Sequence, residues 1–371
     1  MNIGYDAKRL FNNKTGLGSY SRNLVNCMTE FCPSGSYHLY TTSIKLSEYE
    51  SEFKNLNQIS IHKSTAFNKS IWRTYGISNN LRKDKIDIYH GLTHELPRNI
   101  NSVNCGKVVT IHDLIFKRFP EYFPLLDRAI YNLKWKHSIK SADRIIAISE
   151  HTKADIIEYY GVSPNKIEVI YNTCDPRFYE VNTNTNQQNQ LKLPKNYMLS
   201  VGSIEPRKNF EAIVKALAQI PASQRIDLVI VGGGKQKNKK KLLGLIHSLG
   251  LEKIVHLRSD ITNDQIIEVY NRAEFLVYPS YYEGHGLPIT ESLLCGTAVI
   301  SSGTSSMKEA GGPDCIYIEP NNIDSISDAI ITLLDDSDLR KSISTKGQQY
   351  ASQTFDRQII AKQTLNLYKN L

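Results

Sequence analysis

Short apolar runs alternate with amphipathic stretches along most of the chain. The apolar runs occupy residues 2–6, 86–90, 107–112, 144–149 and 166–171 in the first half, and 197–201, 227–231, 254–257, 274–278, 298–301 and 316–318 in the second. Between them, apolar residues recur at helical spacing, for example over 209–218, 239–249 and 264–273. Apolar strands that alternate with helices predict parallel sheets covered on both faces.

The polar stretch 181–190 interrupts this pattern near the middle of the chain. It is uncharged and nearly devoid of apolar residues, so it cannot bury a core and is typical of a linker or an exposed loop. We therefore predict an α/β protein of two doubly wound, Rossmann-like domains, which suits a length of 371 residues. The predicted parts are an N-terminal domain at 1–180, a linker at 181–194, a C-terminal domain at 195–355 and a C-terminal helix at 356–371.

Charge and cysteine content narrow the class of protein further. The chain carries 45 Lys and Arg against 37 Asp and Glu, a net charge of +8, and residues 1–180 hold 24 and 18 of these, a net charge of +6. This excess favours a phosphate-bearing partner or an anionic membrane, and it is equally typical of a surface that keeps a protein in solution. Apolar runs stay shorter than the ~20 residues of a membrane span. No secretory signal is visible, and the six cysteines lack metal-site spacing, so we expect a cytoplasmic protein with reduced thiols.

Chemistry is expected just after each predicted strand, because parallel sheets bind ligands beyond the carboxyl ends of their strands, here in a cleft between the two domains. Gly16 and Gly18 precede a helix; such a pair suits a phosphate, although it is more often a simple turn. His112 ends a strand, where it either faces the cleft or makes a structural hydrogen bond. His90 ends an earlier strand, His94 comes four residues later, and both are further candidates to line the cleft.

Two segments of the second half carry stronger signals. Arg207 and Lys208 follow a strand, and adjacent cations at a strand end can bind an anion, although alone such a pair is usually a surface feature. Glu283 and Glu291 flank a glycine-rich loop and a helix start at Pro288. Backbone N–H groups and the helix dipole suit a phosphate, and carboxylates suit hydroxyls, so this segment predicts a sugar-phosphate site.

Four segments together resemble one family, the retaining glycosyltransferases of family 4, which have the GT-B fold. They are the Glu-x7-Glu signature Glu283-Gly284-His285-Gly286-Leu287-Pro288…Glu291, the diphosphate-binding segment 201–209, the glycine loop Gly16-Leu17-Gly18 and the His-Asp motif Ile111-His112-Asp113-Leu114. The last motif resembles that of mannosyltransferase-like members, which build bacterial surface polysaccharides. The resemblance covers nearly the whole chain, and it implies two domains that face a cleft and a last helix that crosses back to the first domain.

The resemblance also implies roles for the motif residues. Glu291 would accept hydrogen bonds from the donor ribose, and Glu283 would face the donor sugar. Arg207 and Lys208 would neutralise the departing diphosphate, and His112 would lie beside the reacting carbon. Further donor contacts would come from Gly16, Gly18, Gly284, His285, Gly286, Leu287 and Pro288.

Two departures from the family pattern bear on these roles. Ser203 stands where Arg is frequent, so more of the charge compensation falls on Arg207 and Lys208, and His285 stands where Phe is frequent, which alters the expected sugar contacts. No acidic pair near the motifs is placed to hold a divalent ion, so no metal and no cofactor are expected. For retention, Glu283 could act as a nucleophile, but the resemblance favours a front-face substitution.

Acceptor, donor and class of activity stay open at this stage. The resemblance implies GDP-mannose as donor and a glycan or lipid-linked glycan as acceptor. The aromatic and basic segment 116–137 is typical either of a surface that rests on the anionic inner face of the cytoplasmic membrane or of helices packed under an ordinary surface. Nucleic acid is not expected, because the lysine run 235–241 lacks interleaved aromatics. The alternatives are a nucleotide-sugar epimerase, a phosphorylase with a lysine-bound pyridoxal cofactor, and a non-catalytic nucleotide-sugar binding protein.

Overall fold

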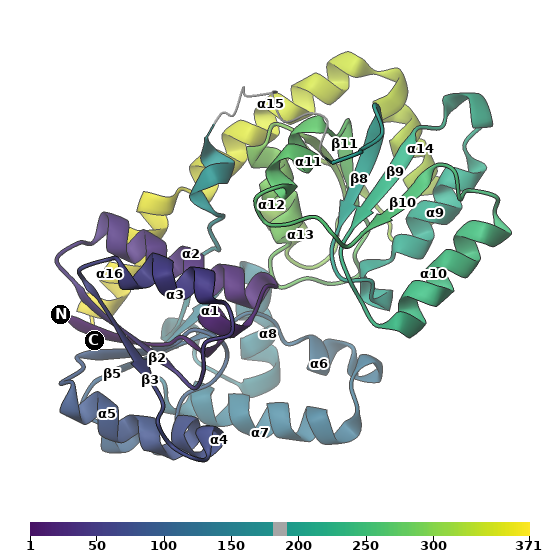
Figure 1. The fold of residues 1–371 in the computed structure, drawn as a ribbon. Helices are drawn as coiled ribbons and strands as arrows, with labels where there is room; N and C mark the ends of the chain where they lie inside the picture. Colours follow the sequence, from purple (N-terminus) through teal and green to yellow (C-terminus); the bar gives the residue numbers. More distant parts are fainter. Residues whose placement is uncertain (181–190) are drawn as a thin grey trace. The chain divides into compact units, whose positions relative to one another are not determined.

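The computed structural model describes residues 1–180 and 191–371, which form two compact domains (Figure 1). The first domain comprises Met1–Asp175 and Phe355–Leu371, and the second comprises Pro176–Thr354. Of the predicted linker 181–194, residues 181–190 lie outside the described residues.

The division falls a few residues before the predicted boundary at 180. Arg177 forms an ion pair with Asp264 of the second domain, at 2.5 Å between Nη1 and Oδ1. The Phe178 ring packs against Tyr270, also of the second domain, with ring centroids 6.0 Å apart. The segment from residue 176 therefore belongs to the second domain.

The first domain is built on a sheet of seven parallel strands, in the order β3-β2-β1-β4-β5-β6-β7. The strands are β1 (Asn2–Asp6), β2 (Ser36–Thr41), β3 (Ile59–Lys63), β4 (Ile88–Gly91), β5 (Gly106–Ile111), β6 (Arg144–Ala147) and β7 (Ile167–Val169). The α-helices are α1 (Lys8–Asn12), α2 (Gly16–Phe31), α3 (Ser47–Lys54), α4 (Lys69–Ile71), α5 (Ile77–Lys83), α6 (Ile115–Arg118), α7 (Leu125–Ser141), α8 (Glu150–Tyr160) and α16 (Arg357–Lys369). The strand order reverses between β1 and β4, which makes their carboxyl ends the switch point of this sheet.

The second domain repeats the plan with six parallel strands, in the order β10-β9-β8-β11-β12-β13. The strands are β8 (Tyr197–Val201), β9 (Asp227–Val231), β10 (Val255–Arg258), β11 (Phe275–Tyr278), β12 (Ala298–Ser302) and β13 (Ile316–Ile318). The helices are α9 (Phe210–Gln219), α10 (Gln236–Ser248), α11 (Ile266–Arg272), α12 (Leu287–Leu294), α13 (Met307–Gly311), α14 (Ile323–Asp335) and α15 (Ser337–Thr354). Here the order reverses between β8 and β11.

Both sheets are buried on their two faces, as continuous apolar strands require. In the second domain, α9, α10 and α14 pack on one face, where Phe210, Leu242 and Ile330 join the core, while α11 and α12 cover the other (Figure 1). Full burial of a side chain of this size stabilises the fold by about 1.5–3 kcal/mol. The predicted architecture of two doubly wound parallel sheets is confirmed.

The C-terminal helix α16 belongs to the first domain, where it packs along α2 (Figure 1). It begins at Asp356, whose side chain accepts a hydrogen bond from the Ile359 N–H at 2.8 Å. Ile360, Leu367 and Tyr368 are buried in the first-domain core. The helix thus completes the sheet's cover after the chain has left the second domain.

Strands β2 and β3 were not predicted. Both alternate apolar and polar residues, as in Ser36–Thr41 and Ile59–Lys63, in place of the continuous apolar runs of the central strands. β3 is the edge strand and part of it is exposed, and alternation is what a half-exposed strand requires. β2 lies next to it and is buried or partly buried along its length.

Candidate functional site

In the second domain, the segments after β8 and β11 are neighbours at the switch point of the sheet. β8 and β11 pair directly, and the chain leaves their carboxyl ends as Gly202–Asn209 and Pro279–Gly286. Open parallel sheets bind ligands at this place. Of the predicted site residues, these two segments hold Arg207, Lys208, Glu283, Gly284, His285 and Gly286.

The segment after β8 is held tightly against its neighbours. Gly202 has a φ of +151°, and a Cβ on it would lie 3.2 Å from the Lys208 side chain, so the glycine lets that lysine cross the backbone. Asn209 adopts a left-handed conformation with a φ of +57° and begins α9. Its Nδ2 donates to the carbonyls of Pro279, at 3.2 Å, and Pro320, at 2.7 Å. Asn209 therefore fixes Lys208 relative to the loop after β11.

A buried carboxylate, Glu283, lies at the centre of this site. Four donors converge on its Oε1: Lys208 Nζ at 2.6 Å, Arg207 Nη1 at 2.7 Å, Ser280 Oγ at 2.5 Å and the Tyr278 hydroxyl at 3.1 Å. Within the described ranges, the recorded hydrogen bonds and ion pairs of this carboxylate all use Oε1, which leaves Oε2 to contact a ligand.

The charge of Glu283 follows from these contacts. Burial opposes ionisation of the carboxyl group, but the charges of Arg207 and Lys208 and the hydrogen bonds from Lys208 and Ser280 outweigh it and lower the pKa of Glu283 to about 2. The carboxylate is therefore ionised at neutral pH. It can accept hydrogen bonds from a ligand, and it cannot serve as a general acid there.

The backbone of Glu283 is held as firmly as its side chain. Its N–H donates to Ser305 Oγ at 3.0 Å, and its carbonyl accepts from Ser306 Oγ at 2.8 Å. Ser305 has a φ of +49°, an uncommon conformation for a residue with a side chain. The segment between β12 and α13 thus presets the direction of the carboxylate.

The second carboxylate, Glu291, lies on α12 and is half-buried. Tyr270 donates to its Oε2 at 2.8 Å. The helix begins after Gly286, which has a φ of +98° and so suits glycine, and Pro288 occupies the first turn, as predicted from the sequence. His285 and Gly286 are buried, whereas Gly284, Leu287 and Pro288 are partly exposed. His285 Nε2 lies 3.3 Å from Thr290 Oγ1 within the same segment.

In the first domain, the glycine pair lies at the start of α2. Gly16 is exposed at the first position of the helix. Gly18 is buried, and its N–H donates to Asn13 Oδ1 at 3.2 Å and to the Thr15 carbonyl at 2.8 Å. A Cβ at Gly18 would lie 1.9 Å from the Asn13 carbonyl oxygen. The amide of Gly18 is thus engaged within the turn, and Gly16 is the glycine exposed to a ligand.

His112 follows β5, and the structure fixes its tautomer. Its Nε2 lies 2.8 Å from the Leu92 carbonyl, so this nitrogen carries the proton and Nδ1 is the acceptor. Burial, opposed by the Leu92 hydrogen bond and aided by Arg9, lowers the pKa of His112 to about 4. The ring packs edge-on against Tyr20, with centroids 4.6 Å apart. His112 is a neutral hydrogen-bonding group at neutral pH.

His90 and His94 lie near the end of the same strand, β4, but they differ in their hydrogen-bond partners. His90 is fully buried between the Tyr368 hydroxyl and Thr110 Oγ1, each 2.7 Å from one of its ring nitrogens. It is therefore structural, and its predicted place in a cleft is wrong. His94 is 8% exposed with a φ of +63°, and among the described residues its Nδ1 has no hydrogen-bond partner. A buried orphan nitrogen in a strained residue is typical of a functional site.

A paired arginine lies beside His94. Arg73, in the turn Trp72–Gly76, contacts Asp6 at the end of β1, at 2.5 Å between Nη2 and Oδ2. Its Nη1 lies 2.6 Å from Glu95 Oε2, next to His94 in the chain. Asp6 and Glu95 thereby join the ends of β1 and β4 at the switch point of the first sheet.

Comparisons with known proteins decide the family. The model described as "Glycosyl transferases group 1" matches residues 181–350, and "Glycosyltransferase Family 4" matches residues 16–178. The O-antigen chain mannosyltransferase B of Escherichia coli is 31% identical over 297 residues, which cover 78% of this chain and 76% of the relative. The chain belongs to glycosyltransferase family 4.

Solved structures agree on the fold of this glycosyltransferase. HepE of Anabaena, in complex with UDP and glucose, has a TM-score of 0.79 at 19% identity and covers 100% of each chain. WaaG, a glycosyltransferase involved in lipopolysaccharide biosynthesis, has a TM-score of 0.73 at 18% identity and covers 99% of each chain. The fold is GT-B, as predicted from the motifs.

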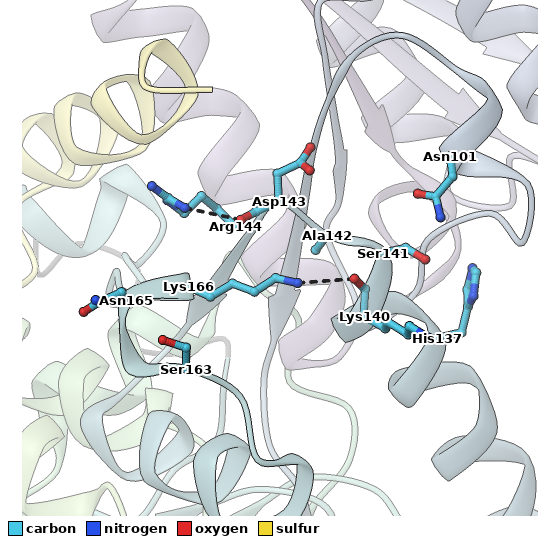
Figure 2. A pocket seen from close by; sticks show the side chains of 10 residues that line it. All are labelled: Asn101, His137, Lys140, Ser141, Ala142, Asp143, Arg144, Ser163, Asn165 and Lys166. Carbon is cyan, nitrogen blue, oxygen red and sulfur yellow. Dashed lines mark hydrogen bonds between the residues drawn. The ribbon is translucent and has the colours of Figure 1, made fainter.

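A pocket on the first domain lies away from these strand ends (Figure 2). It opens at the amino ends of β6 and β7, next to Arg144 and Lys166. Lys166 Nζ donates to the carbonyls of Ile139, at 2.9 Å, and Lys140, at 3.3 Å, at the end of α7. These contacts stabilise the C-terminus of the helix, where a cation is favoured. Because ligands of parallel sheets bind at the carboxyl ends, this pocket is not the active site of the glycosyltransferase.

The motifs missed several residues that shape the site. Tyr278 and Ser280 both donate to Glu283, and Tyr270 donates to Glu291. In a sequence, a tyrosine within an apolar run is read as packing. Ser280 lies two residues after the strand end, which is the one signal that could have marked it.

Proposed function

We propose that this family 4 glycosyltransferase transfers a hexose, mannose, from a nucleoside diphosphate sugar to a glycan or lipid-linked glycan in surface polysaccharide synthesis, with retention of the anomeric configuration. One observation carries the proposal: the ionised Glu283 is held at Oε1 by Lys208 and Arg207, and its Oε2 is left for a ligand. The mannosyltransferase relative of Escherichia coli supports mannose, and GDP-mannose is the donor that we propose.

The donor would lie across the carboxyl ends of β8 and β11. Glu283 would accept hydrogen bonds from sugar hydroxyls through Oε2. Glu291, oriented by Tyr270, would accept them from the ribose. The backbone amides at the start of α12, after Gly286, would contact the sugar or the diphosphate, because a helix N-terminus offers unpaired N–H groups to an anion.

Arg207 and Lys208 would stabilise the leaving diphosphate in place of a metal ion. Both cations are held by Glu283 and by the turn Pro206–Lys208, so their charge is in position before the donor arrives. Fixed charge at the point where charge develops contributes about 10²–10³ in rate for a single donor group. Added chelator would then leave the transfer rate unchanged.

A front-face substitution fits the state of Glu283 better than a double displacement does. A carboxylate whose pKa lies near 2 and whose Oε1 is occupied by four donors is a weak nucleophile. The leaving phosphate would instead help to deprotonate the acceptor hydroxyl. His112, neutral with Nδ1 as acceptor, would lie beside the reacting carbon.

The acceptor would be bound by the first domain, with His94 as one contact. Its buried orphan Nδ1 can exchange a hydrogen bond with a sugar hydroxyl, and its ring stacks on Trp135, with centroids 4.0 Å apart. The stacked ring cannot turn away from the site, so the acceptor hydroxyl would meet a fixed partner.

We further propose that α7 rests on the anionic cytoplasmic face of a membrane that carries the acceptor. No described helix is long and apolar enough to cross a membrane. The apolar cluster of α7, defined as Leu125, Leu126, Ile130 and Leu133, is exposed, and helical spacing places its members on one side. Lys136 and Lys140 extend that side and suit anionic headgroups.

Part of the basic character of segment 116–137 is used inside the first domain. Arg118 is paired with Asp155 at 2.6 Å, and Lys134 with Glu95 at 3.4 Å. Trp135 is buried. The membrane proposal therefore rests on the exposed side of α7 and not on the whole segment.

A transfer assay tests the proposed function. Purified protein is mixed with nucleoside diphosphate sugars and an undecaprenyl-diphosphate glycan acceptor, and nucleoside diphosphate release and product anomers are followed by chromatography and NMR. We expect GDP release from GDP-mannose, an α-linked product and no loss with EDTA. If the protein binds the donor but neither transfers the sugar nor slowly hydrolyses the donor, it is not an enzyme and the proposal is contradicted. If the donor is epimerised and no acceptor product forms, the protein is an epimerase and not a transferase.

A further inference from the structure

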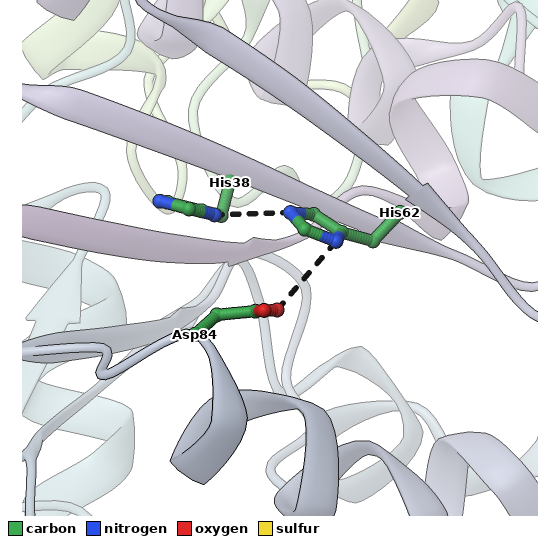
Figure 3. A group of neighbouring side chains, drawn as sticks. All are labelled: His38, His62 and Asp84. Atoms are coloured by element: carbon green, nitrogen blue, oxygen red, sulfur yellow. Dashed lines mark hydrogen bonds and ion pairs between the residues drawn. The ribbon is translucent and has the colours of Figure 1, made fainter.

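A group of three side chains outside the proposed active site is arranged as a metal-binding site. His38 lies on β2, His62 on β3 and Asp84 just after α5, all in the first domain (Figure 3). His62 is paired across the two strands with Tyr40, two residues from His38, so both imidazoles project on one face of the sheet. Each of the three residues offers one ligand atom, and these atoms lie within 4.8 Å of one another.

The spacing of these atoms suits a small divalent ion. His38 Nδ1 lies 2.9 Å from His62 Nε2, whereas Asp84 Oδ2 lies 3.5 Å from the other ring nitrogen of His62, Nδ1. One ion takes only one of these two nitrogens, so each residue contributes a single ligand atom. Tetrahedral Zn²⁺ with bonds of about 2.0–2.1 Å holds its ligand atoms roughly 3.3 Å apart. Binding of one ion therefore breaks the hydrogen bond between the histidines and draws ligand atoms that lie within 4.8 Å of one another to this spacing.

Outer contacts orient two of the three ligands. Ser36 Oγ lies 3.3 Å from His38 Nε2, which turns Nδ1 toward His62. The Tyr40 hydroxyl donates to Asp84 Oδ2 at 2.7 Å. Such second contacts are typical of metal sites, where they fix the ring and the carboxylate. The three rings of His38, Tyr40 and His62 also stack on one another, with centroids 4.6–6.4 Å apart, which limits their rotation.

Solvent can reach the three side chains. With side-chain exposures of 26% for His62 and 17% for Asp84, an ion and its waters can reach the site from solvent.

We propose that His38, His62 and Asp84 bind one divalent transition-metal ion of the Zn²⁺ class, with water completing the coordination. A set of two imidazoles and a carboxylate suits such ions, whereas Mg²⁺ and Ca²⁺ prefer ligand sets made of oxygen atoms. The ion ties the two outer strands β2 and β3 to the end of α5. It acts on the stability of the first domain and takes no part in the proposed sugar transfer.

Calorimetric titration of the tag-free full chain with ZnCl2, after EDTA treatment and dialysis, tests the site. We expect one Zn²⁺ per chain, a melting temperature that rises with Zn²⁺, and a Co²⁺ adduct with tetrahedral absorption bands. His38→Gln, His62→Gln and Asp84→Asn each weaken Zn²⁺ binding at least 10-fold. His256→Gln is the matched control, because it removes a half-exposed histidine that is paired with Asp227 in the second domain.

The outcomes separate the site from its alternatives. Unchanged melting in EDTA shows that a variant is folded; if His62→Gln fails this check, Asp84→Asn, which keeps both rings, decides. Absence of Zn²⁺ binding to the wild type overturns the proposal and leaves a plain hydrogen-bonded histidine pair. Equal binding by the wild type and the three variants also overturns it, because the ion then lies elsewhere.

Discussion

The two sheets of this glycosyltransferase have the same winding, yet the candidate ligand contacts at their strand ends differ in charge, because the charges at the first sheet's switch point, Asp6, Arg73 and Glu95, pair with one another. In the second domain, Glu283 is ionised and is held by Lys208 and Arg207. In the first domain, three histidines at the ends of β4 and β5 are neutral: His90 within β4, His94 after it and His112 after β5. Burial is the first cause of the low pKa of all three.

The difference shows how one physical effect gives opposite results. Burial disfavours the charged form of every group. Glu283 keeps its charge because two cations and two hydroxyls compensate the loss of water, whereas His90 meets only the neutral partners Tyr368 and Thr110. The shared fold determines where a ligand lies, and the partners of each group determine whether it meets a diphosphate or a hydroxyl.

The largest expected effect follows from removing one cation of the second domain. Lys208→Ala should lower kcat about 10²–10³-fold, because the diphosphate leaves without a fixed positive charge. Steady-state kinetics with GDP-mannose measures this effect. Lys241→Ala is the control, since Lys241 pairs with Glu211 on the exposed side of α10. A folded Lys208→Ala protein with wild-type kcat would contradict the claim that the charged groups of the second domain stabilise the leaving diphosphate.

Acid should unfold the first domain before the second. Below pH 6.5 the unfolded histidines take up protons, whereas folded His90, with a pKa of about 3, and His112, with a pKa of about 4, resist. The contribution of these histidines to stability is therefore fully present above pH 6.5 and is lost as the pH falls. Near pH 4, each histidine shifts the unfolding equilibrium about 100-fold toward the unfolded state. Trp72 and Trp135 are the two tryptophans and both lie in the first domain, so their fluorescence in urea reports it alone.

The second domain should respond at lower pH. The lowered pKa of Glu283, about 2 against an ordinary 4.5, contributes stability that is present above pH 4.5 and lost as the pH falls toward 2. Circular dichroism that remains after the fluorescence change reports this domain, and Glu283→Gln removes the dependence. Coincident transitions of the two signals at every pH would contradict the separate windows.

A smaller effect is expected at the ribose. Glu291→Gln should raise the donor KM about 10-fold with little change in kcat, because a charged acceptor of hydrogen bonds is replaced by a neutral one. Glu274→Gln, at the exposed ion pair with Arg340, is the control. A drop in kcat at unchanged KM would move Glu291 from donor binding to the chemical step.

The comparison extends to the surface, where most of the exposed large apolar side chains belong to the first domain. Replacing Leu125 and Leu126 by Ser should weaken binding to vesicles of phosphatidylglycerol and phosphatidylcholine several-fold. Leu243→Ser is the matched control, because Leu243 is exposed on a lysine-rich helix of the second domain. Failure of the wild type to float with these anionic vesicles would contradict the membrane proposal.

The sequence predicted the second domain more completely than the first. All six of its strands coincide with the apolar runs of the sequence, and Arg207, Lys208 and Glu283 stand in the segments that follow two of them. Signals local in the sequence were therefore enough to predict the strands and the charged site residues of this domain. By contrast, the amide of Gly18 turned out to be engaged by Asn13, a detail of turn geometry that residue types do not reveal.

First-domain chemistry depends on contacts between distant parts of the chain. His90 and His94 are four residues apart, and the first is structural because Tyr368 in α16 and Thr110 in β5 bind its two ring nitrogens. His38, His62 and Asp84 are more than twenty residues apart from one another in sequence, and they lie on or beside strands whose alternating pattern hid them. Spacing along the chain carries no signal of this group, because the three side chains meet across the sheet edge.

The central claim is that Glu283 and its two cations bind a nucleoside diphosphate sugar. Isothermal titration of the wild type and of Glu283→Gln with GDP-mannose and with GDP tests it most directly. The account predicts one GDP-mannose per chain, at least 10-fold weaker binding of GDP-mannose by the variant, and a smaller change for GDP, which lacks the sugar that Oε2 contacts. Equal affinity of both proteins for GDP-mannose would contradict it.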